Sequence, residues 1–150
     1  MARYSSSINK AGVNSATTTY VNLWLPTNRG FIREIGISVT TAPSNAQDWY
    51  LVRATARGTQ TATQAGTALT PDAASSTGTV DNTWSGNPTV GAATAALRRF
   101  GLPVTAGSGI IWTFAKGDLE VSNSNGLAIV NANASGGTLG AFTFYFDWEE

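Results

Sequence analysis

The feature that most constrains the fold is a strict alternation of aromatic and polar side chains near the end of the chain. Between Leu139 and Glu149, one face of the expected strand carries Thr143, Tyr145 and Asp147. The alternate positions carry large aromatic residues. Those aromatic residues are Phe142, Phe144, Phe146 and Trp148. Successive side chains of a β-strand point to opposite faces, so all four rings share one face. Together they would bury on the order of 600–1,000 Å². We therefore expect this strand in a core or a subunit interface.

A period of two also marks the first third of the chain. Apolar residues alternate with polar ones in Thr17–Leu25 and again in Gly30–Thr40, where Phe31 falls on the apolar face and Arg33 interrupts it. Both segments are predicted to be half-buried strands. The intervening residues Pro26–Gly30 have turn composition, which predicts that the two strands form a hairpin. Trp49 to Arg57 is a further strand candidate.

The last third contains short apolar runs separated by turn residues. Gly109–Phe114 is rich in β-branched and aromatic residues, and shorter extended runs are expected at Leu119–Val121 and Leu127–Asn131. Asn125-Gly126 precedes the last of these, and this dipeptide favours a hairpin turn because both residues tolerate positive φ.

The pattern fades between Gly58 and Ala96, a stretch dominated by Thr, Ala, Gly and Ser. One interpretation is a set of short edge strands with a long loop around residues 71–88. The other interpretation is a long loop that binds a partner, because long loops in small domains are usually functional or disordered.

These patterns predict an all-β chain, a jelly-roll-like sandwich of about eight short antiparallel strands. We expect residues 1–16 to form an extended N-terminal arm and residues 17–150 to form a single β-sandwich domain. The terminal segment lacks an apolar signal sequence, and the uncharged stretch from Val121 to Phe146 is broken by Asn, Ser and Gly. We therefore expect synthesis in the cytoplasm and no membrane association.

The charge content limits the classes of function. Charged residues are 12% of the chain and sum to a net charge of zero, against about 25% in an ordinary soluble domain. Nucleic-acid binding depends on a surplus of basic residues, so we expect none. The chain has no cysteine and no histidine. It therefore lacks thiolates, the usual general base and the commonest metal ligand, and we expect neither catalysis nor a cofactor.

Three sets of residues could still carry a function. Asp118 and Glu120 would share one strand face, either as solvated carboxylates or as a catalytic or calcium-binding pair. Arg98 and Arg99 are adjacent, so one of them would point inward unless the strand bends. That arginine could pair with a buried carboxylate or lie at a subunit contact, and the alternative is a locally paired surface arginine. Among the five tryptophans, Trp84 lies in a Gly/Asn/Ser-rich stretch and is the one expected to meet a partner.

The chain as a whole resembles the small jelly-roll capsid decoration (cement) proteins of tailed bacteriophages. The likeness lies in a polar amino-terminal segment, a Thr/Ala/Gly-rich middle and a closing pattern, GLAIVNANASGGTLGAFTFYFDWEE, that looks like the end of such proteins. Over most of the chain the likeness is one of general composition. It comes closer to a shared motif in roughly the last 40 residues.

This resemblance implies a structural virion protein that binds the outer surface of a capsid. Such a protein would bridge subunits of the major capsid protein, and it would act as a homotrimer. The extended arm would then lie across a neighbouring subunit, anchored by Arg3, Tyr4 and Lys10. If the aromatic row forms an interface, that interface would lie between subunits of the trimer.

The alternative is a lectin-like module associated with a phage tail or fibre. It would bind host glycans through exposed aromatic and amide side chains. Its candidate residues are Trp84, Asp81 and Asn82.

Overall fold

The computed structural model describes residues 1–13, 18–71, 73–133 and 138–150. Strands make up nearly all of the regular structure in these residues, which confirms the all-β prediction. The first strands are β1 (Arg3–Ala11), β2 (Thr18–Leu25), β3 (Gly30–Thr41), β4 (Gln47–Ala56), β5 (Thr59–Ala65), β6 (Thr67–Ala68) and β7 (Thr79–Gly86). They are followed by β8 (Thr89–Val90), a 3-10 turn η1 (Ala93–Ala95), β9 (Arg98–Leu102), β10 (Gly109–Thr113), β11 (Glu120–Val121), β12 (Asn125–Asn131) and β13 (Ala141–Glu149).

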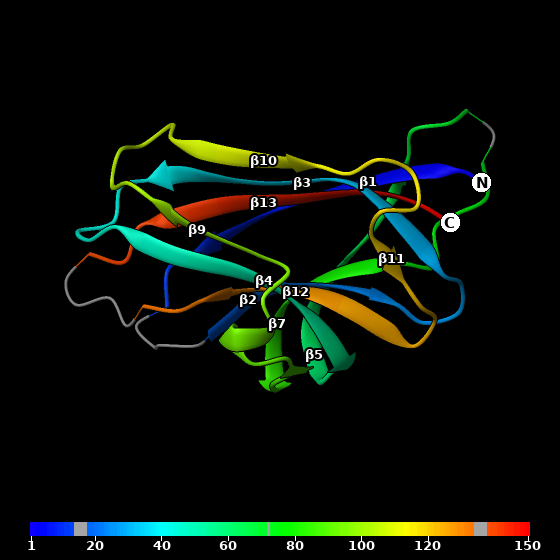
Figure 1. Cartoon of the computed structure of the whole chain (residues 1–150), viewed down its shortest axis with the longest axis horizontal. Coiled ribbons are helices and arrows are strands. Elements are labelled where there is room, and N and C mark those ends of the chain that lie inside the picture. Colours follow the sequence, from blue (N-terminus) through cyan, green and yellow to red (C-terminus); the bar gives the residue numbers. More distant parts are fainter. Residues whose placement is uncertain (14–17, 72, 134–137) are drawn as a thin grey trace.

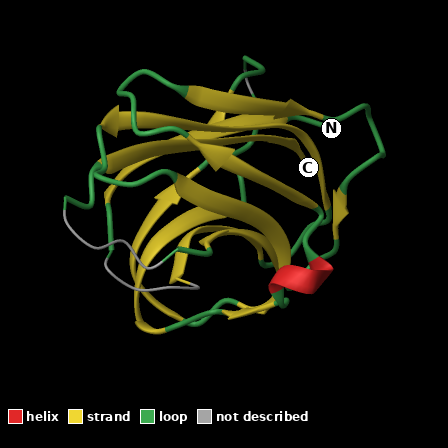
Figure 2. Cartoon of the chain, turned by 60° about the vertical axis from the view of Figure 1, so that its left-hand side comes forward, coloured by secondary structure: helices red, strands yellow, loops and turns green. Residues whose placement is uncertain are grey.

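The strands form two sheets that face each other in a sandwich (Figures 1 and 2). Sheet A has the order β10-β3-β13-β1-β6, and β11 also pairs with β3. Sheet B has the order β5-β7-β2-β12-β4-β8, and β9 also pairs with β4. All of these pairings are antiparallel, which is consistent with a jelly-roll-like sandwich. The described residues hold thirteen strands rather than about eight, because the Thr- and Ala-rich segments add several short ones.

The aromatic row of β13 lies in the core between the two sheets. Phe142, Phe144, Phe146 and Trp148 are all fully buried. Trp49 of sheet B contacts Phe142 and Phe144 edge to face, with ring centroids 4.9 and 5.4 Å apart. Such pairs add about 0.5–1.5 kcal/mol each beyond the area that they bury. The row therefore joins the two sheets of one chain, and it is not available for a subunit interface.

A β-bulge explains why Arg33 interrupts the apolar face of its strand. The register of β3 against β13 shifts so that Ile32 lies opposite Trp148 while Glu34 lies opposite Asp147. Arg33 is the extra residue between them, and the bulge reverses the alternation at this point. Ile32 is fully buried, whereas Phe31 is only partly buried. The prediction that Phe31 shares the inner face is therefore wrong.

The prediction of an extended N-terminal arm is also wrong for the described part of residues 1–16. Arg3–Ala11 forms β1, which pairs with β13 from Arg3 opposite Glu149 to Ala11 opposite Ala141. Every second residue of β1 faces sheet B, and Tyr4 is buried against Trp148. This segment is a strand of the domain, so it is not free to cross a neighbouring subunit. The expected arm–domain boundary, at residues 16 and 17, lies outside the described residues.

Two turn predictions fail for the same physical reason. β2 belongs to sheet B and β3 to sheet A, so the Pro26–Gly30 segment crosses between sheets instead of closing a hairpin. Likewise β11 belongs to sheet A and β12 to sheet B, so the turn between them also crosses between sheets; Asn125-Gly126 lies inside β12, and the positive φ of the turn falls on Ser124, at 56°. Turn residues mark where a chain bends, but they do not specify which sheet receives the next strand.

The region between Gly58 and Ala96 consists mainly of short edge strands, and the loop within it is shorter than expected. β5 and β7 pair with each other at the border of sheet B. Val90, Ala93 and Ala96 then pack against buried residues on the outer face of that sheet. This part of the chain therefore covers a sheet, and Trp84 lies in β7 and not in a loop.

Candidate binding surfaces

The first two residues expected to anchor a partner make contacts inside the chain. Arg3 donates to the Asp147 carboxylate at 2.8 Å, and its side chain remains 46% exposed. The Tyr4 hydroxyl donates to the carbonyl oxygen of Ala74 at 2.7 Å. Tyr4 therefore stabilises the fold, while Arg3 is a partly exposed cation that is already paired.

Lys10 and Trp84, both expected to bind a partner, lie in contact with each other. Lys10 faces sheet B at the border of the sandwich, and its Nζ lies 5.2 Å from the ring centroid of Trp84 and 5.4 Å from that of Tyr20. The same nitrogen donates to the carbonyl oxygen of Asn82. Burial lowers the pKa of Lys10 to about 8. This lysine cluster connects β1 to β7 across the border of the sandwich.

The lysine cluster predicts an unusual dependence of stability on pH. Because the pKa of Lys10 is about 8 in the folded chain and 10.5 ordinarily, the unfolded chain binds more protons between these values. The contribution of Lys10 to stability must therefore rise with pH over this interval. The unfolding free energy of the natural chain minus that of Lys10→Met should rise by about 1 kcal/mol from pH 7.5 to 9.5, after allowance for solvent screening. Urea unfolding at each pH measures it.

Lys116→Met is the matched control, since this lysine side chain is 66% exposed and pairs with Glu149 at 3.6 Å. Around Lys10, Trp84 and Asn82 do not titrate, and burial raises the pKa of Tyr20. If the unfolding free energy of the natural chain minus that of Lys10→Met stays constant or falls as pH rises, the Lys10 amine is not desolvated.

The residues of the glycan-binding alternative are occupied within the chain. The side chain of Asp81 is fully buried and accepts two hydrogen bonds from Arg57, at 2.7 and 2.8 Å. The Asn82 carbonyl accepts from Lys10, and Trp84 lies beside the same amine. Asp81 is therefore not available to a ligand, whereas Asn82 and Trp84 are partly exposed.

Arg98 and Arg99 are both exposed, although they lie on opposite faces of β9. Arg99 lies opposite Tyr50 and pairs with the carboxylate of Asp48, which is diagonally across from it on β4. Arg98 donates to the carbonyl of Leu97 at 2.8 Å and lies over the ring of Phe114, 5.6 Å from its centroid. Neither arginine points into the core, because the strand has two accessible faces at this border.

The two acidic residues considered for catalysis or calcium are not arranged as a site. Asp118 lies in an exposed turn, and Glu120 pairs with Arg29 at 3.4 Å. Within the described residues, no three His, Cys, Asp or Glu side chains gather as metal ligands would. None of the described segments forms a helix long and apolar enough to cross a membrane.

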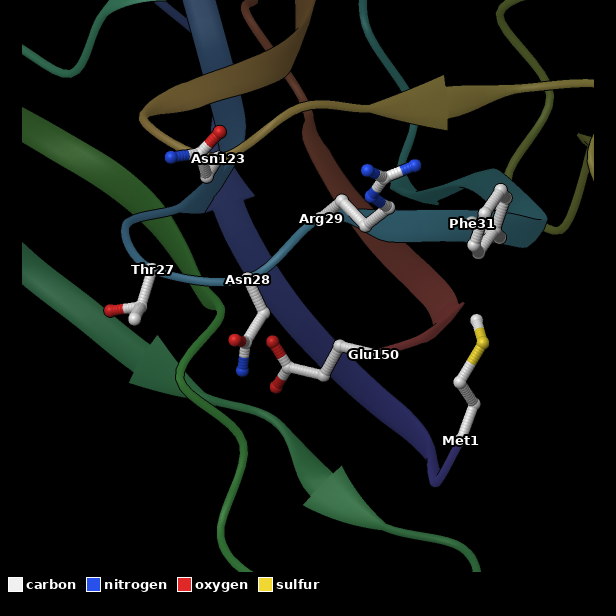
Figure 3. Close-up of a pocket in the computed structure, with 7 residues that line it drawn as sticks. All are labelled: Met1, Thr27, Asn28, Arg29, Phe31, Asn123 and Glu150. Carbon is white, nitrogen blue, oxygen red and sulfur yellow. The ribbon is translucent and has the colours of Figure 1, made fainter.

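A pocket of about 470 Å³ lies where the two ends of the chain meet (Figure 3). Its side chains come from the β2–β3 connection, from the start of β3, from the turn before β12 and from both chain ends. They are Met1, Thr27, Asn28, Arg29, Phe31, Asn123 and Glu150. We refer to this set as the terminal pocket. Sequence patterns did not reveal it, because the bulge that turns Phe31 outward and the meeting of the chain ends are tertiary features.

The rim of the terminal pocket is held in place by the last residue. The Glu150 carboxylate accepts hydrogen bonds from the backbone and hydroxyl of Thr77, at 2.8 and 2.9 Å. The backbones of Ala2 and Glu150 exchange two hydrogen bonds of 3.1 Å. In contrast, the Arg29 side chain is 68% exposed, and its ion-pair partner among the described residues is Glu120, at 3.4 Å. The pocket therefore combines a fixed rim with an accessible cation.

A second hollow, of about 440 Å³, opens on the outer face of sheet A beside β10. Tyr145 borders it, and a Cβ atom added to Gly36 would lie 2.0 Å from the Tyr145 ring, so this ring rests on the glycine backbone. The Tyr145 hydroxyl donates to Glu34, and burial together with this contact raises its pKa. Ile111, on the other side of the hollow, is 60% exposed. We refer to this feature as the sheet A hollow.

Comparison with known proteins does not place the chain in a family. A scan against models of protein families, a search of curated proteins and a search of solved structures each found no match.

Proposed function

We propose that this chain is a structural virion protein that binds the outer surface of a bacteriophage capsid and bridges subunits of the major capsid protein. The resemblance of its closing segment to capsid decoration proteins supports this proposal, and a β-sandwich is the fold that the resemblance implies. The mechanism is mass action. A protein that binds the assembled shell, and not the dissociated subunits, adds its binding free energy to the stability of the shell.

The terminal pocket is the observation that carries the proposal. It brings together Arg29, Phe31 and Met1, and arginine, aromatic residues and methionine are enriched at protein interfaces. The amide side chains of Asn28 and Asn123 supply polar groups at the rim. We infer that a loop of the capsid protein that carries a carboxylate or carbonyl group inserts here and pairs with Arg29.

The fixed rim favours tight docking. Side chains that are already ordered before binding lose less conformational entropy when the partner arrives. The Glu150 carboxylate is held by the loop around Thr77, and the two ends of the chain are hydrogen-bonded to each other. Arg29, whose side chain is 68% exposed, is then a group at the rim that the partner would order.

The ion pairs of the chain connect distant parts of the fold. Asp81 is paired with Arg57, Asp147 with Arg3, and Glu149 with Arg33 at 3.5 Å. Each of these carboxylates therefore contributes to the packing of the fold, through an arginine from another part of the chain.

Co-sedimentation tests the proposal directly. Capsids of the phage that encodes the chain are purified without it and mixed with the recombinant protein at about micromolar concentration. We expect the natural chain to sediment with the shells. Arg29→Ala and Phe31→Ala should each weaken binding by tenfold or more, as residues at the centre of an interface do.

Arg98→Ala is the matched control because it removes one exposed arginine from a different surface. It should bind like the natural chain. Failure of the natural chain to sediment with the shells would overturn the proposed function. Binding that is lost in Arg98→Ala and kept in Arg29→Ala would overturn the assignment to the terminal pocket.

A further inference from the structure

The backbone groups along one side of β10 have no strand partner among the described residues. Ser108 and Phe114 form their backbone hydrogen bonds with β3, at 2.8 and 2.9 Å. The amide and carbonyl groups of a strand point alternately to its two sides. Those of Gly109, Ile111 and Thr113 therefore point away from β3. Within the described residues β10 is the last strand of sheet A, and Figures 1 and 2 both show it at the border of the sheet.

This border lacks the features that usually keep sheet edges apart. Natural edge strands are protected by charges, prolines or bulges. β10 has the sequence GIIWT, and no charged residue occurs between Phe100 and Ala115. Ile111, at the middle of the strand, is 60% exposed. Two copies of this edge can therefore approach each other without repulsion between like charges.

The sheet A hollow lies beside the same edge, and its shape complements Ile111. The hollow is lined in part by Gly107, Gly109 and Ile111. On one face of an antiparallel pair, a side chain also contacts the residue diagonally across from it. When two β10 strands pair about Ile111, the isoleucine of each copy lies diagonal to Gly109 of the other. It then fills the space that the glycine leaves open.

We propose that two copies of this chain pair through β10, antiparallel and around a two-fold axis at Ile111, so that sheet A continues from one copy into the other. In this register Ile111 lies opposite Ile111 of the second copy, and Gly109 lies opposite Thr113. All three residues direct their backbone groups at the partner strand. This contact differs from the homotrimer implied by the resemblance, because a two-fold contact joins two copies only.

The dimer should be weak in dilute solution. Five residues from each copy bury less area than the roughly 1,200–2,000 Å² of a stable interface. The contact becomes important at the high local concentration of an assembled surface, where neighbouring copies are held close together. A test must therefore trap the pair.

The absence of cysteine from the chain makes cross-linking a clean test. Ile111→Cys places one thiol at the axis, where opposite Cα atoms are about 5.5 Å apart, within the range of a disulfide. We expect oxidation, or a short bis-maleimide, to give a covalent dimer at about 100 micromolar protein without any capsid present. Thr61→Cys is the control, because it is also an exposed position on an edge strand, β5.

Ile111→Lys provides a second measurement that needs no thiol. It should raise the dissociation constant at least tenfold in sedimentation equilibrium, while the unfolding midpoint stays close to that of the natural chain. A monomer at all concentrations would overturn the proposal, as would a trimer whose Ile111→Cys form does not cross-link. Equal cross-linking of Ile111→Cys and Thr61→Cys would show random collision, which also overturns it. Because no capsid is involved, these outcomes are independent of the sedimentation test.

Discussion

Replacing Phe144 by alanine is expected to destabilise the folded chain by about 3–5 kcal/mol, the usual cost of removing a buried phenylalanine ring. Phe144 is fully buried at the centre of the aromatic row. Its ring lies 5.4 Å from that of Trp49 and 5.9 Å from that of Tyr20, both of sheet B. The variant therefore leaves a cavity at the junction of the two sheets. Since domains have about 5–15 kcal/mol of stability in total, a large part of it should be lost.

Denaturant unfolding measures this loss, and the neighbouring residue provides the control. Thr143 lies on the opposite face of β13, where its hydroxyl accepts a hydrogen bond from Asn9 at 3.2 Å. Thr143→Ala should cost less than about 1 kcal/mol. Phe144→Leu keeps most of the ring's volume, and it should fall between the two. Equal losses in Phe144→Ala and Thr143→Ala would contradict the burial of the aromatic row.

Replacing Arg57 by leucine should be comparably damaging, at about 3–5 kcal/mol, because it leaves an isolated carboxylate in the interior. The Asp81 side chain is fully buried, while Arg57 is 24% exposed and forms both of the short hydrogen bonds to it. The contact that remains is a 3.4 Å hydrogen bond from the Thr79 hydroxyl. One such bond cannot replace the water and the guanidinium that the carboxylate has lost.

A double-mutant cycle separates this mechanism from a simple loss of packing. Removing both charges, in Arg57→Leu with Asp81→Leu, should recover most of the lost stability, because a buried ion pair replaced by apolar groups is often close to neutral. The coupling energy between the two sites should then exceed about 1 kcal/mol. Additive effects of the two substitutions would argue that the pair does not interact.

The core of the fold could be predicted from the sequence because its signal is local. Phe142, Phe144, Phe146 and Trp148 alternate without interruption, and a period of two has only one structural interpretation at this length. β1 gave a much weaker signal. Its inward residues are Tyr4, Ser6, Ile8 and Lys10, two of which are polar. Its place in sheet A depends on pairing with a strand at the other end of the chain.

The candidate sites were less predictable because they depend on tertiary contacts. Lys10 and Trp84 could be proposed for their residue types, but their mutual contact follows from the packing of β1 beside β7. The terminal pocket requires the bulge at Arg33, which reverses a face that looks regular in the sequence. Ile111 lies in a run that is typical of a buried strand, and its exposure follows from the position of β10 at the border of sheet A.

The pairing of β1 with β13 also bears on how the chain reaches its native state. Arg3 and Asp147, which form an ion pair between these strands, are separated by 144 positions. Contacts between such distant positions slow the search for the native topology, and β-sandwiches rich in them fold on the scale of milliseconds to seconds. On the ribosome, the nascent polypeptide cannot complete sheet A until its aromatic segment has emerged. Translation therefore delays this aromatic stretch until its partner strands are already available.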